Sequence, residues 1–184
     1  MPNTCGPSCA TRSTNRSCHS REANSHNSMT DIVTPTVRSR MMSAIKSRNT
    51  KPELLVRKRL FARGLRYSLH SPSLPGKPDL VFRRYNAVVF VHGCFWHGHE
   101  CHLFKWPKSN PTFWRHKINR NRFVDIRTLK QLRTLGWRTM TVWECAVRGV
   151  PEQRLDVVAD RLKRWIQGQR LSGVISGWRH TTRQ

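Results

Sequence analysis

DLVFRRYNAVVFVH, residues 79–92, contains two apolar runs that are separated by a short polar segment. Both runs are rich in Val and Phe, which are enriched in β-strands. Continuous apolar runs of this length are typical of strands that lie in the centre of a sheet. We therefore expect this stretch to form two central strands of a hairpin.

A helix is expected upstream of the hairpin. Thr50 and Glu53 have the spacing of a capping box, a proline lies in the first turn, and Gly64 follows the last turn. These signals predict a helix over residues 51–63. Residues 65–70, LRYSLH, then alternate apolar and polar side chains, which is typical of a strand.

Two further helices and one strand are expected downstream of the hairpin. Apolar side chains recur at helical spacing over residues 112–134, and Gly136 ends the run. Residues 137–144, WRTMTVWE, predict a strand. A final amphipathic helix should begin at Pro151 and end at Gly168. The order helix, three strands, long helix, strand and helix predicts a mixed α/β domain.

One globular domain is expected, because 184 residues with seven tryptophans can form one substantial core. Residues 1–28 are rich in Ser, Asn, Thr and Arg without any periodicity, which predicts a disordered extension. The domain would then occupy residues 29–168, with a basic arm over residues 29–49. Residues 169–184 are expected to form a flexible polar tail.

The charge of the chain points to a polyanionic partner. The sequence has 34 Lys and Arg against 10 Asp and Glu, a formal net charge of +24, and the basic residues are spread along the whole chain. Nucleic acid is the simplest partner for such a surface, and a membrane-surface protein or a binder without chemistry is the alternative. No apolar run approaches 18 residues and no secretory signal is present, so we expect a cytosolic protein with reduced cysteines.

The hairpin leads into HGCFWHGHECH, residues 92–102, which combines four histidines with two cysteines. Cys94, His99 and Cys101 have a spacing that a tight loop can wrap around one ion, and Cys145 follows the later strand. Three thiolates and one imidazole would form a closed tetrahedral Zn²⁺ site, which has no open position for water and is therefore structural. The alternative is ordinary buried cysteines with a surface histidine.

Asp79 is a candidate ligand for a second metal. It stands directly before an apolar strand and after a proline, where a carboxylate is normally unfavourable. Mg²⁺ binds to one or two carboxylates together with water and phosphate oxygens, so a magnesium site would explain this position. A simple turn aspartate at the start of the strand is the alternative.

A proline and an aspartate that open a strand in a small α/β domain resemble the PD-(D/E)xK nucleases. Four segments, PGKPDLVF, VVFVHGCFWHGHECH, FWRHKI and LGWRTMTVWECAVRG, resemble the very short patch repair endonucleases in order and spacing. The resemblance runs from about Arg38 to Gly149. It implies a restriction-endonuclease-like mixed central sheet that is flanked by helices. It also implies an enzyme that nicks DNA at T:G mismatches left by deamination of 5-methylcytosine.

The resemblance implies a role for each residue of the catalytic site. Asp79 would bind Mg²⁺ together with the backbone carbonyl of Val91. His92 and His97 would flank the scissile phosphate, and imidazole can act there as base or acid near neutral pH. Which histidine has which role stays open. The wider nuclease pattern is not complete, because no E-x-K follows Asp79 and histidines stand in its place.

Two further carboxylates match the family pattern. Glu53 would help to orient the histidine side of the site, although the capping box predicts a glutamate there for structural reasons alone. Asp125 would orient His97, with a plain helix-surface role as the alternative. Val91 stands where some relatives have threonine, which is harmless if only its carbonyl binds metal.

The resemblance also implies a group of residues that contact DNA. Phe95 and Trp96 would push between base pairs from the major groove with help from Trp114, and Met42 would act as a wedge in the minor groove. Core packing is the usual role of such side chains. Adjacent aromatic residues in a polar loop, however, cannot both point into one core.

The function predicted from sequence is thus a monomeric, Mg²⁺-dependent and zinc-containing endonuclease that nicks double-stranded DNA at T:G mismatches. Mismatch-repair proteins are further partners that this function implies, and the bacterial cytoplasm, at the nucleoid, is the expected location. A zinc-stabilised nucleic-acid-binding protein without catalysis is the alternative. Only the enzyme needs Asp79, His92 and His97 together.

Overall fold

The computed structural model describes Thr34, residues 36–37, Arg40 and residues 48–177 of the chain. The extension over residues 1–28 and most of the basic arm, including Met42, lie outside the described residues. The expectations for these segments therefore stay predictions.

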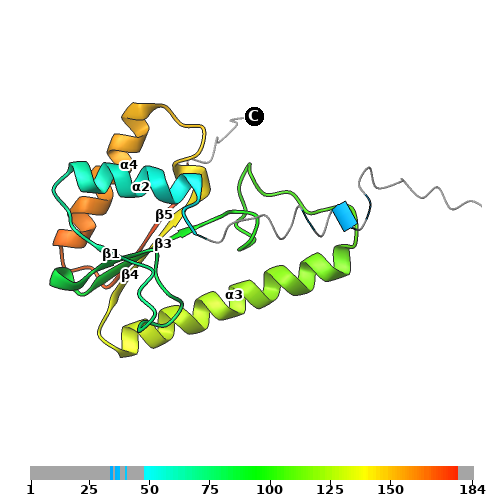
Figure 1. Cartoon of the computed structure of the whole chain (residues 1–184), viewed down its shortest axis with the longest axis horizontal. Helices are drawn as coiled ribbons and strands as arrows, with labels where there is room; N and C mark the ends of the chain where they lie inside the picture. The colour runs from blue at the N-terminus through cyan, green and yellow to red at the C-terminus, as the bar shows by residue number, and fades with distance from the viewer. Residues whose placement is uncertain (1–33, 35, 38–39, 41–47, 178–184) are drawn as a thin grey trace, which may run out of the picture. The chain divides into compact units, whose positions relative to one another are not determined.

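A five-stranded mixed sheet is the centre of the domain, with its strands in the order β1-β2-β3-β4-β5 (Figure 1). The strands are β1 (Ser68–Leu69), β2 (Leu80–Phe82), β3 (Ala87–His92), β4 (Arg138–Trp143) and β5 (Ser172–Ile175). Strand β2 is antiparallel to both of its neighbours, β1 and β3, whereas β3, β4 and β5 are parallel. The mixed α/β class expected from the sequence is confirmed.

The predicted hairpin of β2 and β3 is confirmed. Val81 lies opposite Val88 in its antiparallel register. A short 3-10 helix, Arg83–Tyr85, and Asn86 connect the two strands. Asn86 has a φ of 46°, and asparagine is one of the few residues other than glycine that tolerate this left-handed conformation.

Within residues 48–177, three helices cover the sheet: α2 (Lys51–Ala62), α3 (Pro111–Thr134) and α4 (Glu152–Gln167). Both halves of the predicted capping box are present at the start of α2, where Thr50 and Glu53 bond to each other's backbone N–H groups. The helices agree with the sequence prediction to within about two residues at each end, the usual uncertainty of helix boundaries. Within the described ranges, no helix is long and apolar enough to cross a membrane.

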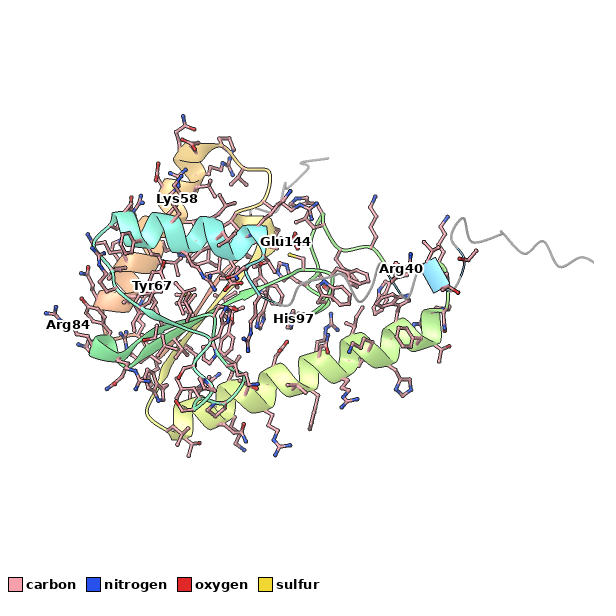
Figure 2. All side chains as sticks on the ribbon, in the orientation of Figure 1. Arg40, Lys58, Tyr67, Arg84, His97 and Glu144 are labelled. Atoms are coloured by element: carbon pink, nitrogen blue, oxygen red, sulfur yellow. The ribbon has the colours of Figure 1, made fainter. Side chains whose placement is uncertain are left out.

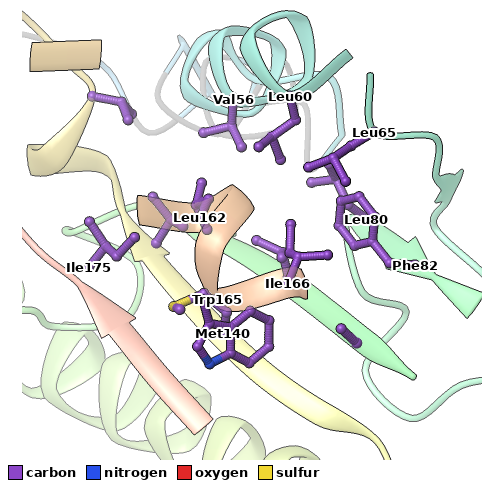
Figure 3. Close-up of a cluster of buried hydrophobic side chains, with 14 of the residues drawn as sticks. Val56, Leu60, Leu65, Leu80, Phe82, Met140, Leu162, Trp165, Ile166 and Ile175 are labelled. Atoms are coloured by element: carbon purple, nitrogen blue, oxygen red, sulfur yellow. The ribbon is translucent and has the colours of Figure 1, made fainter. Parts of the chain in front are cut away.

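Two separate hydrophobic clusters bury the two faces of the sheet. Neighbouring residues of β2 and β3 alternate between them: Leu80 and Val89 belong to the first cluster, and Val81 and Val88 belong to the second. The first cluster lies between the sheet and helices α2 and α4, and the second includes Leu132 of α3 (Figures 1 and 3). Strands that are buried on both faces are apolar throughout, which explains the continuous apolar runs.

Strand β5 corrects the expectation that a flexible tail follows the last helix. Ser172–Ile175 pairs in parallel with β4 at the edge of the sheet. A Cβ atom at Gly173 would lie 2.5 Å from Cε of Met140, so a larger residue there would require the Met140 side chain to move. A parallel pair needs a crossover connection, and α4 provides it. The signal in the sequence is weak, since Val174 and Ile175 are the only apolar pair in the strand.

Candidate active site and metal centre

The site forms where the parallel strands β3 and β4 end. His92 and Trp143 are paired at the last position of the two strands, so the loop after β3 begins beside the end of β4. Helix α3 holds this loop from the other side. Asn121 donates a hydrogen bond to the carbonyl of Trp96 at 2.7 Å, and Arg122 donates to the carbonyl of His97 at 3.3 Å. Figure 2 shows His97 between the sheet and α3.

Gly98 lets the loop turn directly against α3. Its φ of 62° is in the left-handed region, and a Cβ atom would lie 2.6 Å from Cγ2 of the buried Ile118. Arg122 also donates a hydrogen bond to the carbonyl of Gly98. A larger residue would have to move the helix, so glycine is required at this position.

The four predicted zinc ligands meet in one cluster. The ligand atoms of Cys94, His99, Cys101 and Cys145 all lie within 4.8 Å of one another. The sulfurs of Cys94 and Cys145 are each 3.6 Å from Nδ1 of His99. Zinc bonds of about 2.3 Å to sulfur and about 2.0 Å to nitrogen, at tetrahedral angles, place such atoms about 3.5 Å apart. The spacing therefore fits a zinc ion.

The surroundings of the thiols also favour a bound cation. Burial raises the pKa of Cys94 and that of Cys145, so without a cation both thiols would hold their protons. Backbone N–H groups point at the sulfurs: Cys145 donates to Cys94 at 3.4 Å, and Gly177 donates to Cys145 at 3.2 Å. Donors of this kind orient metal ligands and stabilise thiolates. The donor set and its surroundings suit a structural metal.

Two imidazole rings stack beside this cluster. The ring centroids of His92 and His97 are 3.9 Å apart, with an interplanar angle of 2°. Asp125 of α3 lies against the pair, with Oδ2 at 2.6 Å from Nδ1 of His97. Burial, together with the neighbouring His97, lowers the pKa of His92 to about 3. His92 is therefore neutral near pH 7, and the carboxylate of Asp125 contacts His97 rather than facing outward on the helix.

Asp79 precedes β2 and faces the end of β3. Its Oδ2 accepts a hydrogen bond from the backbone N–H of Val91 at 2.7 Å. Burial raises the pKa of Asp79, while the Val91 N–H group and the nearby His70, Arg57 and His97 lower it. A partly buried carboxylate is costly unless it is paired, so a bound cation would stabilise its charged form.

The sequence analysis missed two residues of this region, His70 and Arg57. Oε1 of the buried Glu53 accepts a hydrogen bond from Arg57 and lies 3.2 Å from Nε2 of His70. Nδ1 of His70 lies 3.8 Å from Oδ1 of Asp79. Neither residue lies in the four segments that resemble the nuclease family. In the structure His70 directly follows Leu69 and Asp79 directly precedes Leu80, and Leu69 and Leu80 are paired in the sheet.

The predicted aromatic residues form a cluster of their own outside both cores. The ring of Phe95 lies 5.2 Å from that of Trp96 and 5.1 Å from that of Trp114, and the two tryptophans are 6.1 Å apart. All three side chains are partly exposed. They adjoin the catalytic candidates because Trp96 directly precedes His97 in the loop.

Comparison with known proteins gives consistent matches. The family described as DNA mismatch endonuclease Vsr matches residues 30–103. The DNA mismatch endonuclease Vsr of Escherichia coli K12 is 42% identical over 147 residues, which cover 80% of this chain and 94% of the relative. Type II nicking enzyme V.NmeAIP of Neisseria meningitidis serogroup A is 44% identical over 137 residues, 73% of this chain and 98% of the relative.

A third relative, Type II nicking enzyme V.XorIIP of Xanthomonas oryzae, is 44% identical over 134 residues, 72% of this chain and 98% of the relative. The region that the family matches includes both stacked histidines and three of the four residues of the cysteine cluster, Cys94, His99 and Cys101. At this identity, over nearly the whole length of each relative, the chain belongs to the Vsr family of DNA mismatch endonucleases.

Proposed function

We propose that this Vsr-family nuclease nicks double-stranded DNA next to the T of a T:G mismatch in a Mg²⁺-dependent reaction. The observation that carries the proposal is the convergence of an aspartate and two stacked histidines at the end of β3. The relatives named as mismatch endonuclease and nicking enzymes support the reaction class. A net charge of +24 supports a DNA substrate.

Two metals fit the residues that are present. Asp79 and the backbone carbonyl of Val91 would hold Mg²⁺, in line with the preference of this ion for few protein oxygens. When bound, Mg²⁺ would polarise the scissile phosphate and stabilise the charge that develops on it. The cysteine cluster would hold Zn²⁺, which has no open position and so contributes to folding rather than to hydrolysis.

The proton transfers are assigned to His97. Asp125 holds its Nδ1 side, which leaves Nε2 for the reacting oxygen and stabilises the imidazolium that forms. His92 is a weaker base because its pKa is lowered to about 3 by burial. It serves as a neutral hydrogen-bonding group beside the phosphate. The two rings therefore have different roles although they are stacked on each other.

Mismatch recognition is assigned to the aromatic cluster. Partial exposure leaves Phe95, Trp96 and Trp114 able to insert between base pairs, and stacking on a base contributes about 1–3 kcal/mol for each ring. A mismatched base step costs less free energy to open than a normal one, so the difference favours binding at the mismatch. Met42 would act from the minor groove. The enzyme would work as a monomer at the nucleoid, with mismatch-repair proteins as further partners.

A nicking assay tests the proposal. The purified protein is incubated with T:G and T:A duplexes, with and without Mg²⁺, beside the Asp79→Ala variant. We expect Mg²⁺-dependent nicking of the T:G duplex by the parent. The variant should lose nicking but bind the mismatch within a few fold, because Asp79 contacts metal and not DNA. Mg²⁺-dependent cleavage by Asp79→Ala would contradict the assignment, and binding without any cleavage by the parent would favour a non-catalytic DNA-binding protein.

A further inference from the structure

His70 bridges two carboxylates that come from different elements. Its Nε2 lies 3.2 Å from Oε1 of Glu53 in α2, and its Nδ1 lies 3.8 Å from Oδ1 of Asp79 at the start of β2. The His70 side chain is 14% exposed and that of Glu53 is 2% exposed. The imidazole is therefore enclosed between the helix and the strand, and it reaches the carboxylate that is assigned to Mg²⁺.

Arg57 fixes the tautomer of this imidazole. Its Nη2 lies 2.8 Å from Nε2 of His70 and also donates to Oε1 of Glu53. A guanidinium group has donors and no acceptor, so Nε2 must be the accepting nitrogen and the proton of the neutral ring must lie on Nδ1. The Nδ1–H group therefore faces Oδ1 of Asp79. Without Arg57, the ring could carry its proton on Nε2 instead and donate it to Oε1 of Glu53, 3.2 Å away.

The same contacts argue against His70 as a metal ligand. The ligand atoms of Glu53, His70 and Asp79 lie within 4.8 Å of one another, a spacing that a cation could occupy. The cationic group of Arg57 already contacts the two ligand atoms Oε1 and Nε2. A metal ion at this place would have to displace a guanidinium that is held further by Asn49 at 2.6 Å.

The backbone of His70 has an unusual conformation that keeps the ring in place. Its φ is 45°, in the left-handed region that non-glycine residues rarely adopt. Such a conformation is strained and persists only where the surrounding contacts demand it. Here the contacts are those of the His70 ring with Arg57, Glu53 and Asp79. They explain why His70 keeps this backbone conformation.

We propose that His70 is a positioning residue for Asp79. The backbone N–H of Val91 holds Oδ2 of Asp79 from one side, and the Nδ1–H group of His70, oriented by Arg57, attracts Oδ1 from the other. The carboxylate is thus kept in one rotamer toward the end of β3. This inference rests on the proposed function, in which Asp79 binds Mg²⁺.

Substitutions at His70 test the inference in the zinc-loaded full chain. His70→Ala removes the imidazole whose Nδ1 lies 3.8 Å from Oδ1 of Asp79. His70→Asn retains an amide N–H close to the position of Nδ1 and a residue type that tolerates a positive φ. Asn86→Ala is the matched control, because Asn86 has a φ of 46° at the hairpin turn, away from the site.

Metal binding is measured independently of nicking. The protein is titrated with Mn²⁺ in place of Mg²⁺, and free Mn²⁺ is detected by electron paramagnetic resonance. Half-saturating Mg²⁺ for nicking is measured in parallel. We expect His70→Ala to weaken both by about 10-fold or more, the usual effect of removing a group that orients a metal ligand. His70→Asn should recover most of this loss, and zinc content and mismatch binding should match the parent. Asn86→Ala should lower thermal stability without any change in metal dependence.

The outcomes separate the inference from the proposed function. Parent-like Mn²⁺ binding and Mg²⁺ dependence in His70→Ala would overturn the positioning role, as would a loss in His70→Asn equal to that in His70→Ala. Tighter Mn²⁺ binding by Arg57→Met would also overturn the positioning role. That result would mean that His70 binds the metal directly once the guanidinium is removed. If Asp79→Ala binds Mn²⁺ as well as the parent, the proposed function itself fails.

Discussion

The imidazole of His92 lies parallel to that of His97, with a centroid separation of 3.9 Å. Two rings at this distance cannot both carry a positive charge at low cost. Asp125 contacts His97, whereas burial and the neighbouring imidazole lower the pKa of His92 to about 3. The pair is therefore asymmetric although the two residues are chemically identical.

This asymmetry predicts how stability depends on pH. Unfolded His92 titrates near pH 6.5, and folded His92 near 3. Between these values the unfolded chain binds a proton that the folded chain does not, so the contribution of His92 to stability is lost as the pH falls from about 6.5. The loss should approach about 1 kcal/mol for each pH unit. Urea unfolding at pH 7, 6 and 5 should show a steeper decline for the parent than for His92→Gln. Equal slopes would show that His92 is not held neutral. Both proteins contain the same cysteine cluster, so its effect on the pH dependence cancels when the two slopes are compared.

Asp125→Asn is expected to slow nicking without weakening mismatch binding. The amide can donate a hydrogen bond to Nδ1 of His97, which would favour the wrong tautomer and leave an imidazolium without its counter-charge. Loss of general acid–base catalysis costs about 10²–10⁴-fold. Single-turnover rates at saturating enzyme measure the effect. Asp160→Asn, on the exposed part of α4, is the control. A parent-like rate for Asp125→Asn would show that the contact between Asp125 and His97 has no role in nicking.

One zinc ion per chain is expected in freshly purified protein, by elemental analysis. Cys145→Ser should lower zinc content and folding yield together, because a closed structural site contributes its binding energy to folding. Cys18→Ser provides a matched control in the N-terminal extension and should keep full zinc. Zinc-free parent protein with normal stability would contradict this assignment.

Trp96→Ala should keep the fold and the zinc but lose much of the preference for T:G over T:A duplexes. The Trp96 ring pairs with Phe95 and Trp114 and belongs to neither hydrophobic core cluster, so its loss should leave both sheet cores intact. A loss of one stacked ring corresponds to about 1–3 kcal/mol. Competition binding with the two duplexes measures the preference. Phe123→Ala, an exposed aromatic residue on α3, should behave like the parent. Unchanged discrimination by Trp96→Ala would assign Trp96 to packing alone.

The fold was predictable from sequence where local signals agree with the tertiary structure. The capping box at Thr50 and the two apolar runs mark α2 and the central hairpin without reference to distant residues. Strand β5 carries no such mark. It is a strand because β4 offers an unpaired edge and α4 returns the chain to it, and neither fact can be read from four residues that include a glycine.

Some residues of the candidate site were likewise predictable from sequence, and others were not. The meeting of Cys94, His99, Cys101 and Cys145 was predictable because three of the four lie within eleven residues that have few other uses in such a loop. Arg57 and His70 were not predictable by composition. They meet Asp79 only through the packing of α2 against the first strands and through a backbone angle at His70 that no pattern of residue types announces.

Trp143, at the end of β4, connects the two halves of the site. Its ring stacks on His99 with a centroid distance of 4.2 Å, and its edge meets His92 at 5.5 Å and His97 at 6.3 Å. One rigid indole therefore packs against His99 of the cysteine cluster and against both stacked imidazoles at once. Under the proposed function the imidazoles are ordered before DNA binds, so binding energy is not consumed in ordering them and stays available to distort the substrate.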